Sequence, residues 1–381
     1  VKAGAAGTCQ SRRMLTAIPS LTPLARGFRP FFLLAGLHGL AAMGVWAWIL
    51  HAGPVILPPF PGGAAGWHSR EMVFGYALAV VAGFLLTSVR NWTGHETLRG
   101  GPLGWLAGLW LLGRVTAPLP QPGLLVSAAA DLVFAAVLFF VLLRPVVRVR
   151  QGRQAGILAK VALIGASHGV WVVGALGGMP EVQRAGILSG LLLVIALLLT
   201  VAQRVVPFFT AGTLGEDQRP PDRPWLSRAG LGLMLVFWAL VAFTPWQFPA
   251  GVVAVLLTGV HAVRWAGWVR AGVWRYPLLW VLYVGYLWIV AGFALYAAGG
   301  LLGWPLSPAL HAFGSGAIGP MTVGMMVRVT LGHTGRSIHR LPRGTSLLFS
   351  GMILAALLRV AAPLLIPDLY MGAMAAAQAV W

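Results

Sequence analysis

The sequence predicts an all-α membrane protein, a polytopic bundle of about twelve transmembrane helices with its N-terminus in the cytoplasm. Three observations support this prediction. Hydrophobic residues make up 58% of the 381 residues and charged residues only 9%, whereas a soluble domain has roughly 25% charged residues. The apolar residues form runs near the ~20 residues that a helix needs to cross a bilayer. The basic residues gather in alternate connections between these runs.

The apolar runs between polar or Gly/Pro-rich segments define the predicted spans. In chain order they cover residues 28–50, 72–89, 103–116, 124–143, 157–176, 185–206, 229–244, 249–268, 277–298, 305–331, 345–362 and 367–381. The third, seventh and twelfth runs are short. We expect the twelfth to be a partial span or a span that the end of this chain truncates.

Residues 1–27 precede the first run and carry Lys2, Arg12, Arg13 and Arg26 but no acid. The first apolar run is longer than the ~7–15 residues of a signal-peptide core. We therefore expect a cytoplasmic tail at residues 1–27, followed by a single transmembrane domain at 28–381 whose first span is not cleaved.

Basic residues set the predicted orientation. Four of them, Arg70, Arg114, Arg184 and Arg359, lie on the outer side, and the other 23 of the 27 lie in the tail and the alternate inner connections. Topology explains the net charge of +19, so we expect the lipid bilayer as a partner and no nucleic acid. The protein is expected to be a multi-pass protein of the bacterial inner membrane.

The residue types limit the chemistry. Cys9 is the single cysteine, which excludes an intrachain disulfide and a thiolate metal cluster. A metal site must then use His, Met, carboxylates or backbone oxygens. No span holds paired carboxylates, and no Gly-Lys motif for cradling phosphates occurs.

Polar side chains at membrane depth are candidates for function because they are costly to bury in lipid. His68, Arg70 and Glu71 come just before the second predicted span, near the outer face. Arg114 and Asp131 flank an outer turn. They predict either a structural ion pair or a place where Arg114 holds an anionic group, such as a haem propionate.

His38 and His168 lie near the midplane among small apolar residues. Each fits a buried histidine bonded to a helix carbonyl as well as it fits a ligand. They are also the obvious stations for a proton route.

The tenth predicted span carries three further candidates. His311 and His333 are 22 residues apart on it, about 33 Å along a helix, so they cannot bind the same metal. His311 and His68 lie at similar depth and could do so. Met321, on the same span, is either a soft copper ligand or a packing residue. His333 fits a helix cap, a ligand or a proton-handling group.

Several ordered motifs in this sequence resemble those of the NnrS family, and the similarity covers most of the chain from Phe28 onward. They are Phe28-Arg29-Pro30-Phe31-Phe32, Trp67-His68-Ser69-Arg70-Glu71-Met72-Val73-Phe74-Gly75-Tyr76, Ala82-Gly83-Phe84-Leu85-Leu86-Thr87, Arg204-Val205-Val206-Pro207-Phe208-Phe209-Thr210 and the block from Leu310-His311-Ala312 to Gly332-His333-Thr334-Gly335-Arg336. The resemblance implies a multi-span inner-membrane protein that contains haem and copper. It also implies a role in denitrification and in resistance to nitric oxide and nitrosative stress. Its implied metal candidates are His68, Glu71, His311 and His333.

Two positions depart from the family pattern. Arg70 stands where the family has a second histidine in the motif around His68, and Tyr283 stands where the family often has another. These substitutions count against copper, whereas His68 and His311 suffice for one haem, of the b type.

Three hypotheses follow for the function. In the first, His68 and His311 bind haem, with Arg70 or Arg114 near the propionates. The protein then either turns over nitric oxide as an oxidoreductase, with electrons from quinol or another donor, or binds the gas without turnover. In the second, the histidines of a membrane carrier or exporter bind a metal or small anion transiently. In the third, the chain is an assembly subunit without a ligand.

Overall fold

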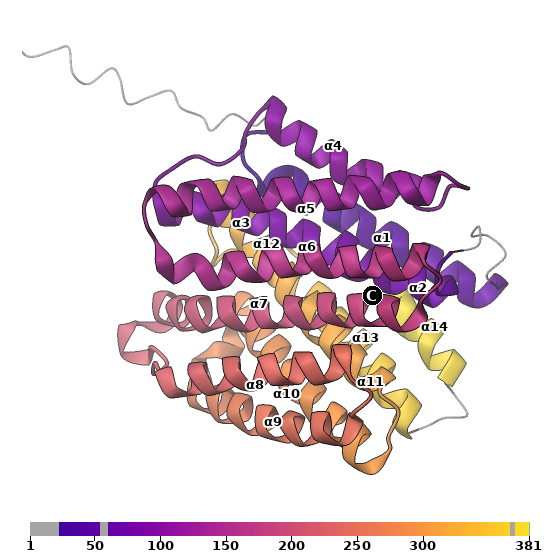
Figure 1. The fold of residues 1–381 in the computed structure, drawn as a ribbon. Helices are drawn as coiled ribbons and strands as arrows, with labels where there is room; N and C mark the ends of the chain where they lie inside the picture. The colour runs from indigo at the N-terminus through magenta and orange to yellow at the C-terminus, as the bar shows by residue number, and fades with distance from the viewer. Residues whose placement is uncertain (1–22, 54–59, 366–369, 381) are drawn as a thin grey trace, which may run out of the picture.

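The computed structural model describes residues 23–53, 60–365 and 370–380, and all regular structure in them is helical (Figure 1). Most of the predicted tail, including Cys9, lies outside the described residues. The N-terminal half contains α1 (Phe28–Ala52), α2 (Gly63–Arg70), η2 (Glu71–Ala77), α3 (Leu78–Thr93), α4 (Gly101–Thr116), α5 (Gly123–Arg148), η3 (Gly152–Gln154) and α6 (Ala155–Leu176). The C-terminal half contains α7 (Pro180–Leu214), η4 (Glu216–Gln218), α8 (Pro224–Phe243), α9 (Gln247–Trp268), η5 (Ala271–Arg275), α10 (Pro277–Leu302), α11 (Ser307–His311), η6 (Ala312–Ile318), α12 (Gly319–His333), α13 (Thr345–Leu365) and α14 (Tyr370–Val380).

Helices occur at all twelve predicted positions, but nine in the described part of the chain are long and apolar enough to cross a membrane. The three exceptions have separate causes. Helix α4 has only 16 residues. The tenth predicted span is divided among α11, η6 and α12 and carries polar residues. Helix α14 has 11 described residues. The expected number of twelve full spans is therefore not confirmed.

The second predicted span begins earlier than expected. The helix runs through α2, η2 and α3 as one stretch, Gly63–Thr93, so His68, Arg70 and Glu71 lie inside it and not before it. Hydropathy places the start of this span too late, because these polar side chains lower the mean hydropathy of the segment. Inside the protein, other side chains pair with Arg70 and Glu71.

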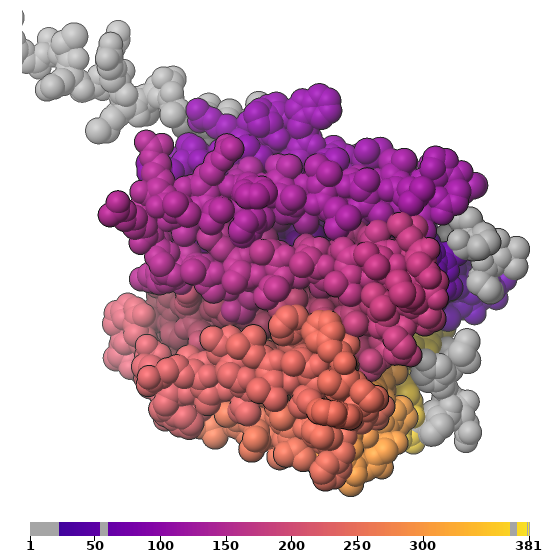
Figure 2. Space-filling model, in the orientation of Figure 1, coloured from indigo at the N-terminus to yellow at the C-terminus, as the bar shows by residue number. Residues whose placement is uncertain are grey.

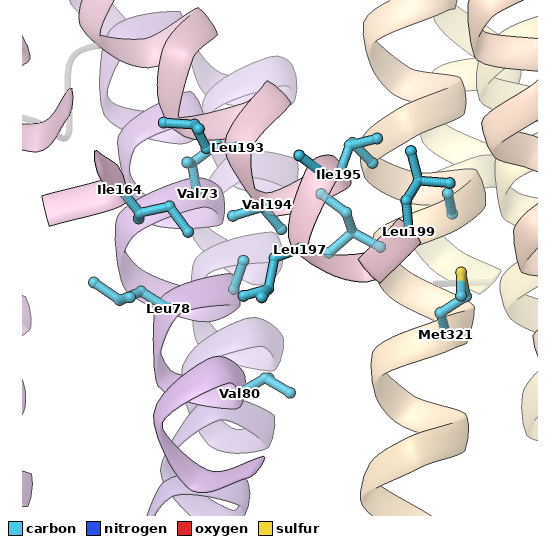
Figure 3. Close-up of a cluster of buried hydrophobic side chains, with 14 of the residues drawn as sticks. Val73, Leu78, Val80, Ile164, Leu193, Val194, Ile195, Leu197, Leu199 and Met321 are labelled. Carbon is cyan, nitrogen blue, oxygen red and sulfur yellow. The ribbon is translucent and has the colours of Figure 1, made fainter. Parts of the chain in front are cut away.

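Helix α7 is at the centre of the bundle. It packs along α6 and α8 and also contacts α10, η2 and η6. Buried side chains of α7, such as Leu193 and Leu197, lie between Val73 and Leu78 on one side and Met321 on the other (Figure 3). This shared apolar core holds the N-terminal and C-terminal halves together. On one face of the molecule, helices α4 to α8 lie side by side (Figure 2).

The outer surface of the bundle is apolar. Large hydrophobic side chains such as Leu40, Trp105 and Leu347 are exposed by 75%, 83% and 76%. In water such a surface would aggregate, whereas lipid solvates it at no cost. The two most basic connections, α5–α6 and α7–α8, lie at the same end of the bundle (Figure 1), where Arg204 of α7 bonds to Gln154 and Arg153.

Two π-helices interrupt the α-helical pattern. Segment η2 follows Arg70 directly, and η6 follows His311 directly. Pro320 explains the second, because a proline removes a backbone donor and clashes with the carbonyl of the residue four positions earlier, Gly316, which lies in η6. Such π-segments are frequent at functional sites. Both therefore direct attention to the residues beside them.

Candidate functional site

The segment of residues 67–76 presents polar groups to two different regions. Glu71 and Gly75 face helices α4 and α5, whereas His68, Met72 and Tyr76 line a pocket shared with the C-terminal helices. The π-helix η2 spans the residues from Glu71 onward. Because its turn is wider than that of an α-helix, it changes which side chains fall on each face.

Two arginines and two carboxylates form a buried charge network on the first face. Arg70 donates to Glu71 Oε1 at 2.6 Å and to Asp131 Oδ2 at 2.6 Å. Arg114 donates to Glu71 Oε2 at 2.9 Å and also to Asp131 Oδ2. All four side chains are buried. Two positive charges thus balance two negative ones, in a place where an unpaired charge would cost several kcal/mol.

Neutral groups complete the charge network. Ser127 accepts a hydrogen bond from Arg70 at 2.6 Å and donates one to the Gly113 carbonyl at 2.6 Å. The Trp110 indole donates to the Gly75 carbonyl at 3.2 Å, which joins α4 to η2. Arg70 also lies over the Trp171 ring, 5.3 Å from its centroid. The network therefore ties together α2, η2, α4, α5 and α6.

Two glycines allow these side chains to approach the backbone. A Cβ at Gly75 would lie 2.6 Å from Arg114 Nη1 and 2.8 Å from His38 Nε2. A Cβ at Gly113 would lie 2.3 Å from Asp131 Oδ1. Real Cβ atoms do not approach other atoms so closely, so a side chain at either position would displace the network.

His38 and His168, the two histidines expected near the midplane, flank the charge network. His38 Nε2 lies 3.2 Å from Glu71 Oε2, and its ring meets Trp110 edge-on. His168 Nε2 lies 3.8 Å from Asp131 Oδ2, and its ring stacks on Trp171. Each histidine is thus a neighbour of one carboxylate, and neither lines the pocket on the other face.

The charge network contains three residues for which the sequence predicted roles at a cofactor. The predicted Arg114–Asp131 ion pair is present, but Arg70 and Glu71 share it. Arg70 and Arg114 were expected near haem propionates, and Glu71 as a metal ligand. Instead, both guanidinium groups bond to carboxylates, and Glu71 bonds to both arginines. Arg70 Nε, Arg114 Nε and Asp131 Oδ1 are buried without a hydrogen-bond partner in the described part of the chain.

On the second face lies a cavity of about 240 Å³, here called the histidine pocket, which is lined by His68, His311 and Arg359 among mostly apolar side chains. Residues of α1, α2, η2, α7, α11, η6, α13 and α14 contribute to it. Its described lining residues include one arginine and no acid. The structure thus brings together the two histidines that the sequence placed at similar depth.

The two imidazoles of the histidine pocket differ in their bonding. His311 Nδ1 lies 2.8 Å from the Ser307 carbonyl, so that nitrogen is the donor and Nε2 keeps the lone pair. The His68 ring stacks on Trp46 at 4.4 Å, and its Nδ1 is buried without a hydrogen-bond partner. Arg359 Nη2 donates to Ser307 Oγ at 3.1 Å, close to the bond that orients His311.

The remaining candidates lie elsewhere. His333, at the end of α12, hydrogen-bonds to Arg26 at 2.7 Å and stacks on Phe28. Met321 is buried and packs against Gly285. The Tyr283 hydroxyl bonds to Thr210 Oγ1 at 2.9 Å and to the Trp268 carbonyl at 3.1 Å. No group of three or more His, Cys, Asp or Glu suited to a metal occurs among the residues with a described structure.

Three residues that complete these sites were not among the sequence candidates. Arg359 had been noted only as an outer basic residue, although a charge inside an apolar run is itself a signal of function. Ser127 and Trp46 carry no such signal, because serine and tryptophan are common in apolar helices. Their roles depend on which helices become neighbours.

Taken together, the fold and the two polar regions define a multi-span helical membrane protein with a balanced buried charge network beside a histidine-lined pocket. The family model described as "NnrS protein" matches residues 22–381. The chain therefore belongs to the NnrS family. No curated protein and no solved structure matches the chain.

Proposed function

We propose that this NnrS-family protein binds haem through His68 and His311 and acts in the nitric oxide and nitrosative-stress response at the bacterial inner membrane, in connection with denitrification. One observation carries the proposal: two imidazoles from distant parts of the chain line the same apolar pocket. Histidine nitrogens are common axial ligands of haem iron. The family name fits a nitric oxide role.

The donor set of the histidine pocket suits haem. Each ring offers a nitrogen that is not engaged by the protein, and the pocket walls are otherwise mainly apolar. Arg359 supplies the positive charge for a propionate in place of Arg70 and Arg114. The cavity of about 240 Å³ is smaller than the roughly 300–1,000 Å³ of pockets for drug-sized ligands. A haem would need more room than this cavity offers, so the helices that line it would have to move apart on binding.

When bound, haem iron would supply a centre for one-electron transfer, and a diatomic gas would bind it in place of one of the two imidazoles. The protein's part is to position the ligands. Ser307 orients the His311 ring, and stacking on Trp46 orients the His68 ring. The charge network anchors Arg70 and Glu71 to α4 and α5, which fixes the stretch of chain that carries His68.

The first test is the visible spectrum of detergent-purified full-length protein and of its His68→Ala and His311→Ala variants. We expect the wild type to show a Soret band that shifts on reduction and again with nitric oxide, and both variants to lose the band while eluting as folded protein. His51→Ala is the matched control, because His51 is exposed and its hydrogen bond within the described residues is to the Ala47 carbonyl of its own helix. Unchanged spectra in both variants would overturn the ligand assignment.

Two further measurements separate the mechanisms. Consumption of nitric oxide with a reduced quinol distinguishes an oxidoreductase from a protein that only binds the gas. A colourless wild type without iron would instead favour a carrier. Copper is quantified in the same preparation, because Arg70 and Tyr283 stand where the family has histidines. Both side chains are bonded within the protein, Arg70 to carboxylates and Tyr283 to Thr210.

A further inference from the structure

A second cavity lies between α7, α8 and α9, at the end of the bundle that carries the basic connections. Its volume is about 750 Å³. It is here called the arginine cavity, because Arg204, Arg219, Arg223, Arg228 and Arg264 line it. Asp222 is the single acid among its described lining residues. The cavity thus carries a large excess of positive charge.

Two of these arginines already have partners. Arg219 forms a salt bridge with Glu216 at 2.7 Å. Arg204 donates to Gln154 Oε1 at 2.6 Å and to the Arg153 carbonyl at 2.9 Å. Arg223, Arg228 and Arg264 form no salt bridge within the described ranges. These three are the groups with donors available to a ligand.

Arg264 is the most informative of the three because it is only 5% exposed. Its hydrogen-bond partner is the hydroxyl of Ser227 at 3.2 Å, and its guanidinium lies 5.9 Å from the centroid of the Trp268 ring. A buried cation is costly, and Asp222, the carboxylate of the same cavity, interacts with Arg264 without forming a salt bridge among the described residues. A bound anion would offset more of that cost. By contrast, every arginine of the charge network has a carboxylate partner.

The other two arginines are exposed and lie nearer the mouth of the arginine cavity. The Arg223 guanidinium lies over Gly267 of α9, 3.7 Å from where a Cβ would be. Arg228 is on the first turns of α8. Guanidinium groups bind phosphate oxygens in a bidentate way, which suits them to phosphates more than to simple halides.

We propose that the arginine cavity binds a phosphate group, either of an anionic phospholipid headgroup or of a soluble phosphate ester. Basic pockets between helices at the cytoplasmic ends of spans are known to take anionic headgroups. The apolar residues Leu226, Val263 and Trp268 line the same cavity and would meet the glycerol and upper chain of a lipid. This site is independent of the histidine pocket.

The test uses full-length protein with one lipid probe and one soluble probe. Native mass spectrometry and binding titration measure the binding of each. Phosphatidylglycerol in nanodiscs of otherwise zwitterionic lipid represents the headgroup, and glycerol phosphate represents the soluble ester. The variant is Arg223→Gln/Arg228→Gln, whose positions are exposed and so leave the fold intact. The control is Arg144→Gln/Arg148→Gln, which removes the same charge from exposed positions on α5.

We expect the wild type to bind one of the probes and the Arg223→Gln/Arg228→Gln variant to bind it roughly 30-fold more weakly, which is the fold-change for two basic residues at about 1 kcal/mol each near an anionic surface. The control variant should bind like the wild type. Phosphatidylglycerol binding alone identifies a lipid site, and glycerol phosphate binding identifies a soluble ester site. Binding of neither probe, or equal weakening in the control, would overturn the proposal.

Discussion

The charge network and the histidine pocket lie on opposite faces of the same stretch of chain, residues 67–76, yet their polar groups are bonded in opposite ways. In the charge network Arg70 and Arg114 each reach both Glu71 and Asp131. In the histidine pocket two imidazoles line one cavity, and Nδ1 of His68 is buried without a hydrogen-bond partner among the residues that the structure describes. Charges that pair with one another indicate a structural role, whereas two imidazoles that line one mainly apolar cavity indicate a place for a ligand.

The largest expected effect comes from removing one arginine of the charge network. Arg114→Gln leaves two buried carboxylates with Arg70 alone, and breaking a buried pair typically costs about 3–5 kcal/mol. We expect a strongly lowered unfolding temperature in detergent. The double variant Arg114→Gln/Asp131→Asn restores the balance of one positive and one negative charge and should recover part of the loss.

This pair of variants can break the comparison. If Arg114→Gln were as stable as the wild type, the charge network would not be structural. If the double variant were less stable than Arg114→Gln, restoring the charge balance would not restore stability. The balance of charges would then not be what stabilises the network. Thermal unfolding followed by circular dichroism at fixed detergent concentration measures both outcomes.

The next effect tests the close approach at the π-helix. Gly75→Ala places a Cβ against Arg114 and His38, and overpacking of this kind typically costs about 1–3 kcal/mol. Gly36→Ala is the matched control, because a Cβ at Gly36 meets nothing within 4 Å. The control should be neutral or slightly stabilising, since alanine favours a helix by up to about 1 kcal/mol over glycine. Equal unfolding temperatures for the two variants would contradict the tight packing at Gly75.

The sequence predicted the positions of the helices better than it predicted which polar side chains of different helices contact one another. The predicted spans beginning at residues 28, 277 and 345 coincide with the starts of α1, α10 and α13, because apolar runs bounded by Gly or Pro fix helix positions in lipid. His68 and His311, which the sequence places at similar depth, line the same cavity. The sharing of Asp131 by Arg70 and Arg114 was not predictable in this way, since it depends on how α2 rotates against α4 and α5.

The smallest expected effect concerns one hydrogen bond between residues 67–76 and the C-terminal half. The Tyr76 hydroxyl of η2 hydrogen-bonds to Thr322 Oγ1 of α12 at 2.9 Å, and Tyr76 also lines the histidine pocket. Tyr76→Phe removes the hydroxyl but keeps the ring, so it should lower stability by only about 1 kcal/mol. Because the imidazoles are unchanged, the variant should keep its Soret band and lose only a few degrees in unfolding temperature. Complete loss of the band with normal stability would instead place Tyr76 among the groups that hold the cofactor. The histidine pocket would then depend on the Tyr76 hydroxyl as well as on the two imidazoles.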